Sequence, residues 1–321
     1  MKNGIMIAGT ALVDKINSIN KYPSSGELTK IISVSRSTGG NVPNVGIDLK
    51  KIDGDLPVFA STRVGNDSDG DFIIETLKEN GLNVDFINRS KSSSTSFTDV
   101  MSVVGGQRTF FTYAGACAEY GLDDLDFNSV KVDMLHLGYF LLLDRVDAGD
   151  GEKILKKAKE SGIKTSIDLV SENSDRYSLI IPCLKWTDNL IINESEAGKI
   201  TGICPERKNL REIATRLKEM GVKERVIIHM PELGVCLSDN GYTEIPSLML
   251  PKDFVLGTTG AGDAFCAGAL YGIFKNFTDN EILNFASSVA ALSLRTENAT
   301  DGIVSFKEIQ LLTKNFKRHE L

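Results

Sequence analysis

The sequence predicts an α/β fold in which helices cover both faces of a mostly parallel sheet, with a smaller β-sheet attached. Short apolar segments alternate with segments of helical period, and several of the latter end in glycine. Such alternation is typical of parallel strands joined by helical crossovers. Two further segments, 13–37 and 95–113, carry β-branched and aromatic residues without helical period and predict the smaller sheet.

The elements of the main sheet follow in chain order. Helices that end in Gly81, Gly162 and Gly221 have the stop residue favoured just after a helix, and a new apolar segment follows each one. Strands are expected at 4–8, 58–61, 134–137, 165–169, 190–192 and 225–230, and helices at 42–51, 71–80, 151–161 and 210–220.

The smaller sheet divides the chain into two parts. Gly105 and Gly106 predict a hairpin turn inside its second segment. The chain leaves the main domain twice and returns twice. We therefore expect one domain made of residues 1–12, 38–94 and 114–321, and a projecting sheet made of residues 13–37 and 95–113.

Charge and composition exclude several kinds of partner. The 321 residues include 36 Lys and Arg against 43 Asp and Glu, for a net charge of -7, and no basic tract occurs. A nucleic acid or an anionic membrane would be repelled. The beginning of the chain lacks the pattern of a secretory signal, and no apolar run approaches the length of about 18 residues that a membrane helix needs. A cytoplasmic location is expected.

The five cysteines are scattered singly along the chain. With an odd total and no C-x-x-C pair, their spacing argues against a disulfide framework or a thiolate zinc site. They are expected to be reduced and mostly buried. They are Cys117, Cys183, Cys204, Cys236 and Cys266.

A glycine-rich stretch at 254–268, FVLGTTGAGDAFCAG, has the G-x-x-x-x-G spacing of a P-loop but carries Asp263 where that motif needs lysine. The following residues favour a tightly packed helix, so Gly260, Ala261 and Gly262 are expected at its N-terminus. Their N–H groups and the helix dipole can hold a phosphoryl oxygen without a lysine. Asp263 can then accept the proton of an attacking hydroxyl. A helix cap beside a tight turn is the alternative.

Four stretches, in the right order, resemble motifs of the ribokinase-like (PfkB) carbohydrate kinases. The resemblance spans nearly the whole chain. It implies a three-layer α/β/α ribokinase-like, nucleotide-binding domain whose small sheet is a lid over the sugar. TGGNVPNVGIDL at 38–49 is similar to the family's G-G-x-x-x-N-x-A, GNDSDG at 65–70 to G-x-D-x-x-G, NESE at 193–196 to N-x-x-E, and TTGAGD at 258–263 to the C-terminal signature.

The resemblance assigns the phosphate chemistry. Asp263 would be the general base, and the amides of 260–263 the anion hole for the γ-phosphate of ATP. Asn193 and Glu196 would act through water on Mg²⁺, which prefers oxygen ligands. A capping box is the equally weighted alternative for this pair. Thr258 is expected beside the nucleotide.

The resemblance also assigns the acceptor site. Asp14, Gly39, Gly40 and Asn44 would hold substrate hydroxyls, the glycines by letting the backbone come close to the sugar. Arg108 is expected to face the substrate from the lid. The alternatives are a simple turn for the two glycines, a solvated loop residue for Asp14 and an exposed strand residue for Arg108.

Three positions depart from the family pattern. Gly257 stands where the signature usually has the aspartate of a monovalent-cation site, which puts K⁺ activation in question. The family's T-x-G element is His229-Met-Pro231 here, and only Gly234 of the following glycines is kept. Pro231 has no N–H for a phosphate, whereas His229 can replace the threonine as a donor. The stretch 295–302 lacks the glycine that is usual in the family's nucleotide and cation loop.

The leading hypothesis is an ATP-dependent, Mg²⁺-requiring kinase for a hydroxyl of a small, non-phosphorylated, fructose- or ribose-like sugar. Asn41 occupies a position where ribokinase and the sugar-phosphate kinases resemble one another in having lysine, and the stretch is nearest the fructokinase-like pattern. Tyr113 stands roughly where kinases of acidic keto-sugars would have an arginine. A homodimer through the lid sheets is implied, because their edges otherwise need protection.

Two other hypotheses stay open. A sugar-binding sensor that has lost catalysis would explain the altered positions Gly257, His229 and Pro231, although the retained Asp263 argues against it. A nucleoside kinase on the same scaffold would use stacking aromatic residues of the lid. The candidates for such stacking are Phe97, Phe110 and Phe111.

Overall fold

The structure, a computed structural model, describes residues 3–129 and 131–320. Its main sheet has nine strands in the order β13-β12-β11-β10-β9-β8-β1-β4-β5. Seven of them run parallel, and β12 and β13 add an antiparallel edge. The bounds are β1 Ile5–Ala8, β4 Val58–Val64, β5 Asn83–Arg89, β8 Met134–Phe140, β9 Lys164–Leu169, β10 Asn189–Asn193, β11 Arg225–His229, β12 Leu233–Ser238 and β13 Gly241–Pro246.

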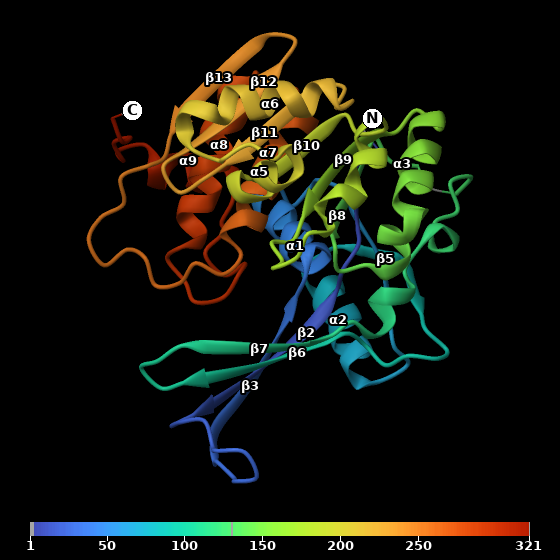
Figure 1. The fold of residues 1–321 in the computed structure, drawn as a ribbon, viewed down its shortest axis with the longest axis vertical. Helices are drawn as coiled ribbons and strands as arrows, with labels where there is room; N and C mark the ends of the chain where they lie inside the picture. The colour runs from blue at the N-terminus through green and yellow to red at the C-terminus, as the bar shows by residue number, and fades with distance from the viewer. Residues whose placement is uncertain (1–2, 130, 321) are drawn as a thin grey trace.

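Helices cover both faces of this sheet (Figure 1). Because successive side chains of a strand point to opposite faces, Ile5 and Ile7 join the core beneath one helix layer, while Met6 joins the core beneath the other. The first layer includes α1, α7 and α8, and the second includes α3 and α6. The helices are α1 Asn41–Ile52, α2 Ser68–Glu79, α3 Gly151–Glu160, α4 Ile181–Leu184, α5 Glu194–Thr201, α6 Leu210–Glu219, α7 Ala261–Phe274, α8 Asp279–Ser293 and α9 Phe306–Thr313.

The predicted fold class is confirmed, and every predicted strand and helix is present. Predicted and observed bounds differ by at most three residues. Helix α2, for example, begins at Ser68 rather than 71 because Asp67 caps it, accepting a hydrogen bond from Gly70 N at 2.9 Å. Within the described residues, no helix combines the length and the apolar character needed to cross a membrane.

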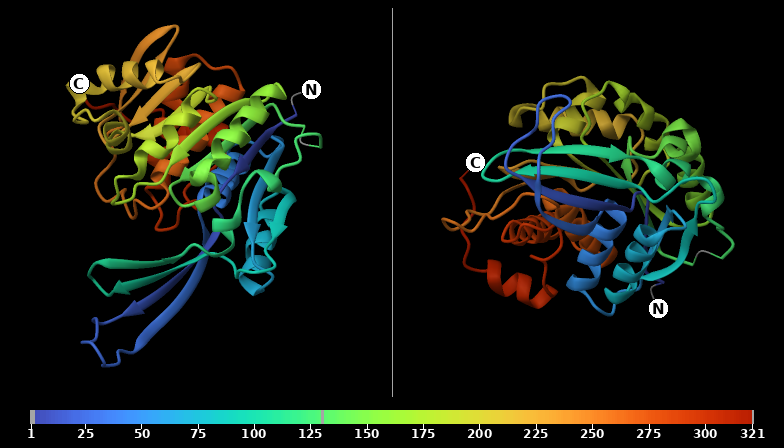
Figure 2. Two further views of the ribbon diagram at one scale, coloured as in Figure 1. Left: turned by 45° about the vertical axis from the view of Figure 1, so that its right-hand side comes forward. Right: turned by 90° about the horizontal axis from the view of Figure 1, so that it is seen from below.

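A second sheet of four strands projects from the main body (Figures 1 and 2). It contains β3 Ile31–Gly39, β2 Leu12–Ile19, β6 Phe97–Val103 and β7 Arg108–Tyr113, in that order across the sheet. The central pair, β2 and β6, is parallel, and each has an antiparallel partner outside it. Gly105, with φ of 69°, lies in the turn between β6 and β7, as predicted. We refer to these four strands as the small sheet.

The GNDSDG stretch forms the joint between the small sheet and the main body. Asp67 accepts hydrogen bonds from Thr95 N at 2.8 Å and from Thr95 Oγ1 at 2.6 Å, at the residue where the chain approaches β6. A Cβ on Gly65 would lie 2.4 Å from Thr95 N, so only glycine permits this close approach. Lys15 of β2 also forms an ion pair with Asp69 at 2.7 Å. This motif therefore anchors the base of the small sheet to α2.

Helix α7 is buried along almost its whole length. It packs against α8 at very short range, because a Cβ on Gly268 would lie 2.8 Å from the Ala286 Cα. Small residues let the two helices approach. The helix is thereby fixed, and with it the loop that precedes its N-terminus.

Helix α1 carries a fully buried carboxylate, Asp48, and neither of its side-chain oxygens has a hydrogen-bond partner among the described residues. Burial, with the nearby charge of Asp263, raises the pKa of Asp48 well above its usual value. An unsatisfied buried polar group costs free energy.

We therefore expect Asp48→Ala to raise the free energy of unfolding at pH 7.5 by about 1–3 kcal/mol, the desolvation penalty that the substitution removes. Urea denaturation of the two proteins measures it. Asp55→Ala, on the exposed turn that follows α1, is the matched control and should leave the value unchanged. A lower free energy of unfolding for Asp48→Ala would contradict the prediction.

Candidate active site

Three cavities adjoin the loop at 257–263 that leads into α7. The apolar cavity, about 490 Å³, lies between this loop, the end of β11 and α8. The central cavity, about 410 Å³, lies over the ends of β8, β9 and β10. The small-sheet cavity, about 380 Å³, lies between the small sheet, α1 and α2. Thr258 lines the first two cavities and Thr259 the third.

Asp263 lies in the first turn of α7 and is held by two donors from other elements. Its Oδ2 accepts hydrogen bonds from Asn44 Nδ2 at 2.8 Å and from the Tyr139 hydroxyl at 3.0 Å. Burial and the charge of Asp168 raise the pKa of Asp263 to about 6, while the two hydrogen bonds oppose this shift. A carboxylate with such a pKa is ionised at neutral pH and is a stronger base than an exposed one.

The start of α7 offers free backbone donors. Gly260 caps the helix with φ of 79°, and a Cβ there would lie 2.5 Å from the Ala299 Cβ. In the described part of the chain, the N–H groups of Gly262 and Asp263 have no acceptor, as expected for a first helical turn. A Cβ on Gly262 would meet only His229 Cε1, at 3.7 Å, so there is space beside it. The N–H of Ala261, which was expected to join them, bonds the Thr258 carbonyl oxygen at 3.3 Å, so the free donors able to hold an anion are those of Gly262 and Asp263.

Tyr139 and Asp168 belong to the same network, although sequence reasoning missed both. Tyr139, at the end of β8, has φ of 59°, and its N–H donates to Asp168 Oδ1 at 2.6 Å. Asp168 lies at the end of β9 and also contacts His136 Nε2 at 3.3 Å. A polar residue at the carboxyl end of a predicted buried strand was an available signal for Asp168. Nothing local in the sequence signals the left-handed conformation of Tyr139.

Asn193 and Glu196 form a capping box at the start of α5. Asn193 Oδ1 accepts from Glu196 N at 2.8 Å, and Glu196 Oε2 accepts from Asn193 N at 3.1 Å. The capping box, which the sequence offered as the alternative role of this pair, is therefore present in the structure. Both residues also line the central cavity, and burial raises the pKa of Glu196 to about 7. The Ser171 hydroxyl donates to Glu196 Oε1 at 2.8 Å.

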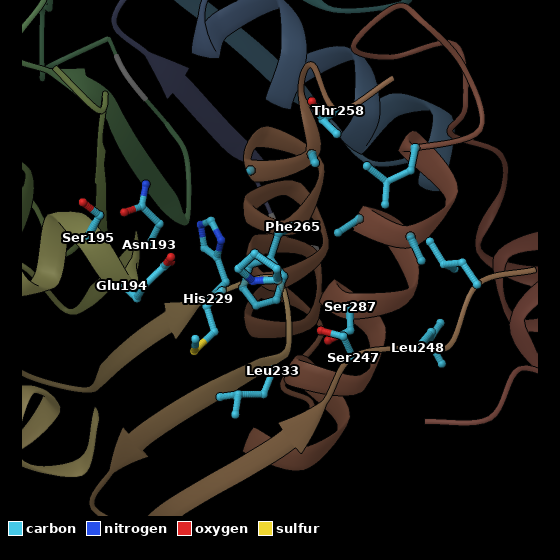
Figure 3. Close-up of a pocket in the computed structure, with 18 residues that line it drawn as sticks. Asn193, Glu194, Ser195, His229, Leu233, Ser247, Leu248, Thr258, Phe265 and Ser287 are labelled. Carbon is cyan, nitrogen blue, oxygen red and sulfur yellow. The ribbon is translucent and has the colours of Figure 1, made fainter. Parts of the chain in front are cut away.

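The apolar cavity holds some of the residues expected beside the nucleotide (Figure 3). The His229 ring lies 4.8 Å from that of Phe265, tilted by 34°. Burial lowers the pKa of His229 to about 4, so its imidazole is neutral at pH 7. Pro231 lines the cavity too. Gly234 does not: it pairs with His229 across β11 and β12, and its missing side chain would point toward Phe265 and Leu283.

The small-sheet cavity brings together Asp14, Asn44 and Arg108. A Cβ on Gly39 would lie 2.3 Å from Asp14 Oδ2, and one on Gly40 would lie 2.5 Å from the Thr10 carbonyl oxygen. Both glycines are therefore required by close packing rather than by a turn alone. Burial raises the pKa of Asp14 to about 6, and its carboxylate has no donor within the described residues.

Asn41 and Gly257, which carried the sequence arguments on the acceptor and on K⁺, both have structural roles. Asn41 is fully buried, accepts from Thr10 N at 2.8 Å and donates to the Ala8 carbonyl oxygen at 3.0 Å. Its side chain therefore joins α1 to β1 and does not line the small-sheet cavity. At Gly257, a Cβ would lie 2.7 Å from the Thr296 carbonyl oxygen, so the loop leaves no room for a side chain.

Comparison with known proteins identifies the family. The model for the pfkB family carbohydrate kinase matches residues 4–305. Ribokinase of Arabidopsis thaliana is 23% identical over 313 residues, which cover 97% of this chain and 81% of that protein. The 5-dehydro-2-deoxygluconokinase of Clostridium perfringens (strain 13 / Type A) is 21% identical over 308 residues, which cover 91% of this chain and 89% of that protein.

Solved structures agree in fold. Arabidopsis thaliana ribokinase complexed with ribose and ATP superimposes with a TM-score of 0.85 at 22% identity, covering 98% of this chain and 99% of that one. Fructokinase with bound ATP from Xylella fastidiosa gives 0.78 at 18% identity, covering 98% and 99%. At these identities the structures establish the ribokinase-like fold alone. The family match over residues 4–305 shows that the chain belongs to the PfkB family of carbohydrate kinases.

The pKa of Asp263 sets an expected pH dependence. A general base acts when deprotonated, so with Asp263 in the role predicted from the sequence, kcat/KM for ATP-dependent phosphorylation should be constant at high pH and fall about tenfold per unit as pH drops below about 6. Tyr139→Phe removes a hydrogen bond that stabilises the carboxylate, so it should move this midpoint to higher pH.

The pH–rate profile of the two proteins tests this expectation. Tyr242→Phe removes a hydroxyl of β13 that contacts Glu244, far from the loop, and should leave the midpoint unchanged. A midpoint for Tyr139→Phe equal to or below that of the unmodified protein would contradict the role of the Tyr139 hydroxyl.

Proposed function

We propose that the protein transfers the γ-phosphate of ATP to a hydroxyl of a small non-phosphorylated sugar, with Asp263 as the general base. The observation that carries the proposal is the position of Asn44. It lines the small-sheet cavity while its Nδ2 holds Asp263 Oδ2 at 2.8 Å at the edge of the central cavity. An acceptor in the small-sheet cavity would therefore lie next to a base that borders the central cavity.

The free amides of α7 support phosphate binding without a basic side chain. Gly262 and Asp263 present N–H groups at the positive end of a buried helix, and a developing negative charge there would be stabilised. The adjoining apolar cavity, with Phe265 and the neutral His229, suits a nucleobase and its sugar. The donor would thus lie on one side of the 257–263 loop and the acceptor on the other.

The oxygen ligands of the central cavity fit Mg²⁺. Glu196 and Asn193 line this cavity and offer the hard oxygen atoms that Mg²⁺ prefers. Their own oxygens are already used in the capping box, which favours contact through water. Mg²⁺, when bound with ATP, would neutralise phosphate charge.

Asp14 supports an uncharged acceptor. Its carboxylate lines the small-sheet cavity and has no donor among the residues that the structure describes, so it can accept hydrogen bonds from sugar hydroxyls and would repel a phosphate or carboxylate group. Arg108 lines the same cavity and is proposed to contact the sugar from the small sheet, which would act as a lid excluding water.

ADP release from ATP and Mg²⁺, across free sugars, sugar phosphates, polyols and nucleosides, tests the proposal. We expect turnover on a free sugar, a loss of about 10²–10⁴-fold in kcat for Asp263→Asn because the base is removed, and no requirement for K⁺, given the crowded Gly257. Asp253→Asn, in the segment before the loop, is the matched control and should retain turnover.

Unchanged turnover in Asp263→Asn would exclude it as the base. A folded protein that binds a sugar but releases no ADP with any acceptor would indicate the sensor, and selective turnover of a nucleoside would indicate the nucleoside kinase.

The small sheet is also proposed to form a homodimer. Val34 of β3 is 69% exposed and Phe111 of β7 is 56% exposed, and the strand register places them on one face of this sheet. Sheet edges and apolar faces of this kind are protected by association.

We expect the protein to sediment as a dimer and Val34→Asp to shift it toward the monomer, because a charge would be buried in the interface. Analytical ultracentrifugation measures this shift. Ser33→Asp, on the opposite face of the same strand, should leave the dimer intact. Equal sedimentation of the unmodified protein and Val34→Asp would contradict the interface.

A further inference from the structure

Beneath the central cavity, three side chains from three elements converge. His136 of β8, Asp168 of β9 and Cys266 of α7 are all buried, and their ligand-type atoms lie within 4.8 Å of one another. His136 Nε2 is 3.3 Å from Asp168 Oδ2 and 3.6 Å from Cys266 Sγ. The spacing of the cysteines argued against a thiolate zinc site, because it cannot register ligands from three separate elements that only the fold brings together.

We propose that His136, Asp168 and Cys266 form a binding site for one thiophilic divalent cation of the Zn²⁺ class. Zn²⁺ binds nitrogen and oxygen at about 2.0–2.1 Å and sulfur at about 2.3 Å, in a tetrahedral arrangement. Ligand atoms around such an ion are separated by about 3.3 Å for nitrogen to oxygen and about 3.6 Å for nitrogen to sulfur. The two distances from His136 Nε2 in the structure match these edges, and the Asp168 and Cys266 ligand atoms lie within 4.8 Å of each other.

The surroundings orient the ligands. The other ring nitrogen of His136, Nδ1, lies 3.1 Å from the Ser166 hydroxyl, which fixes the ring and leaves Nε2 directed at the cluster. Asp168 uses Oδ1 to accept from Tyr139 N, so Oδ2 remains available to the ion. On binding, the Cys266 thiol releases its proton to solvent, and the thiolate and the carboxylate together balance the two positive charges.

The site has an entrance and an open position. Asp168 and Cys266 both line the central cavity, so an ion can reach them from there, whereas His136 is fully buried behind them. Three protein ligands leave the fourth tetrahedral position for a water or a phosphoryl oxygen from the cavity. An occupied site would join the network that holds Tyr139 and, through its hydroxyl, Asp263. Bound Zn²⁺ is therefore expected to inhibit turnover, with release by a chelator.

Cobalt substitution tests the site and is independent of the proposed function. The full-length protein, free of nucleotide, is titrated with Co²⁺ alone. We expect one equivalent to produce the near-ultraviolet thiolate-to-cobalt band and the intense visible bands of a tetrahedral ion, and Zn²⁺ to abolish both. Cys266→Ser should lose the thiolate band. His136→Gln should lose the tetrahedral bands. Cys204→Ser, which alters the exposed cysteine, should retain the complete spectrum.

Extended X-ray absorption fine structure of the unmodified protein loaded with Zn²⁺ tests the site without relying on the folding of variants. One sulfur at about 2.3 Å with nitrogen or oxygen neighbours at about 2.0–2.1 Å is the expected shell. A shell without sulfur, an octahedral Co²⁺ spectrum, or a thiolate band that survives Cys266→Ser in a folded protein would overturn the proposal. Inhibition by Zn²⁺ without these signatures would place the ion elsewhere.

Discussion

The burial of one carboxylate, Asp263, constrains the arrangement of the whole site. A charged group can be removed from water only where donors replace its hydration, and here Asn44 of α1 and Tyr139 of β8 supply them. Three elements must therefore meet at one point. The close packing of α7 on α8 through Gly268 fixes the helix that carries the carboxylate, so its position depends on small residues an entire helical turn away.

The electrostatics of the central cavity rest on the main chain rather than on basic side chains. Asp168, Glu196 and Asp263 line this cavity, no lysine or arginine of the described residues lines it, and the positive groups that face it are backbone amides at the start of α7. Amides and a helix dipole stay fixed, whereas a lysine must be ordered for each binding event. A substrate that carries several negative charges then needs an accompanying cation to approach these carboxylates.

The sequence predicted the fold class, the small sheet and the loop with Asp263, because each depends on local periodicity or on a motif with turn chemistry. The sequence did not predict the roles of Tyr139, Asp168 and His136, since these roles arise only when β8, β9 and α7 meet. The 193–196 motif was ambiguous for a physical reason: a capping box and a cavity-facing pair require the same residue types, and the structure contains both features. Gly234 resembled a phosphate loop residue but packs against Phe265.

The small sheet is attached to the main body at one end, its root, by the hydrogen bonds between Thr95 and Asp67 at the start of α2. Strand β3, with nine residues, extends about 30 Å from this root at about 3.3 Å per residue. Any rotation about the root displaces the free end most. Arg108, beside the distal hairpin, would then travel far, whereas Asp14, near the root, would hardly move. The small-sheet cavity thus has one wall, at Asp14, close to the root and another, at Arg108, far from it, so a rotation of the small sheet would change the width of the cavity without disturbing the groups around Asp263.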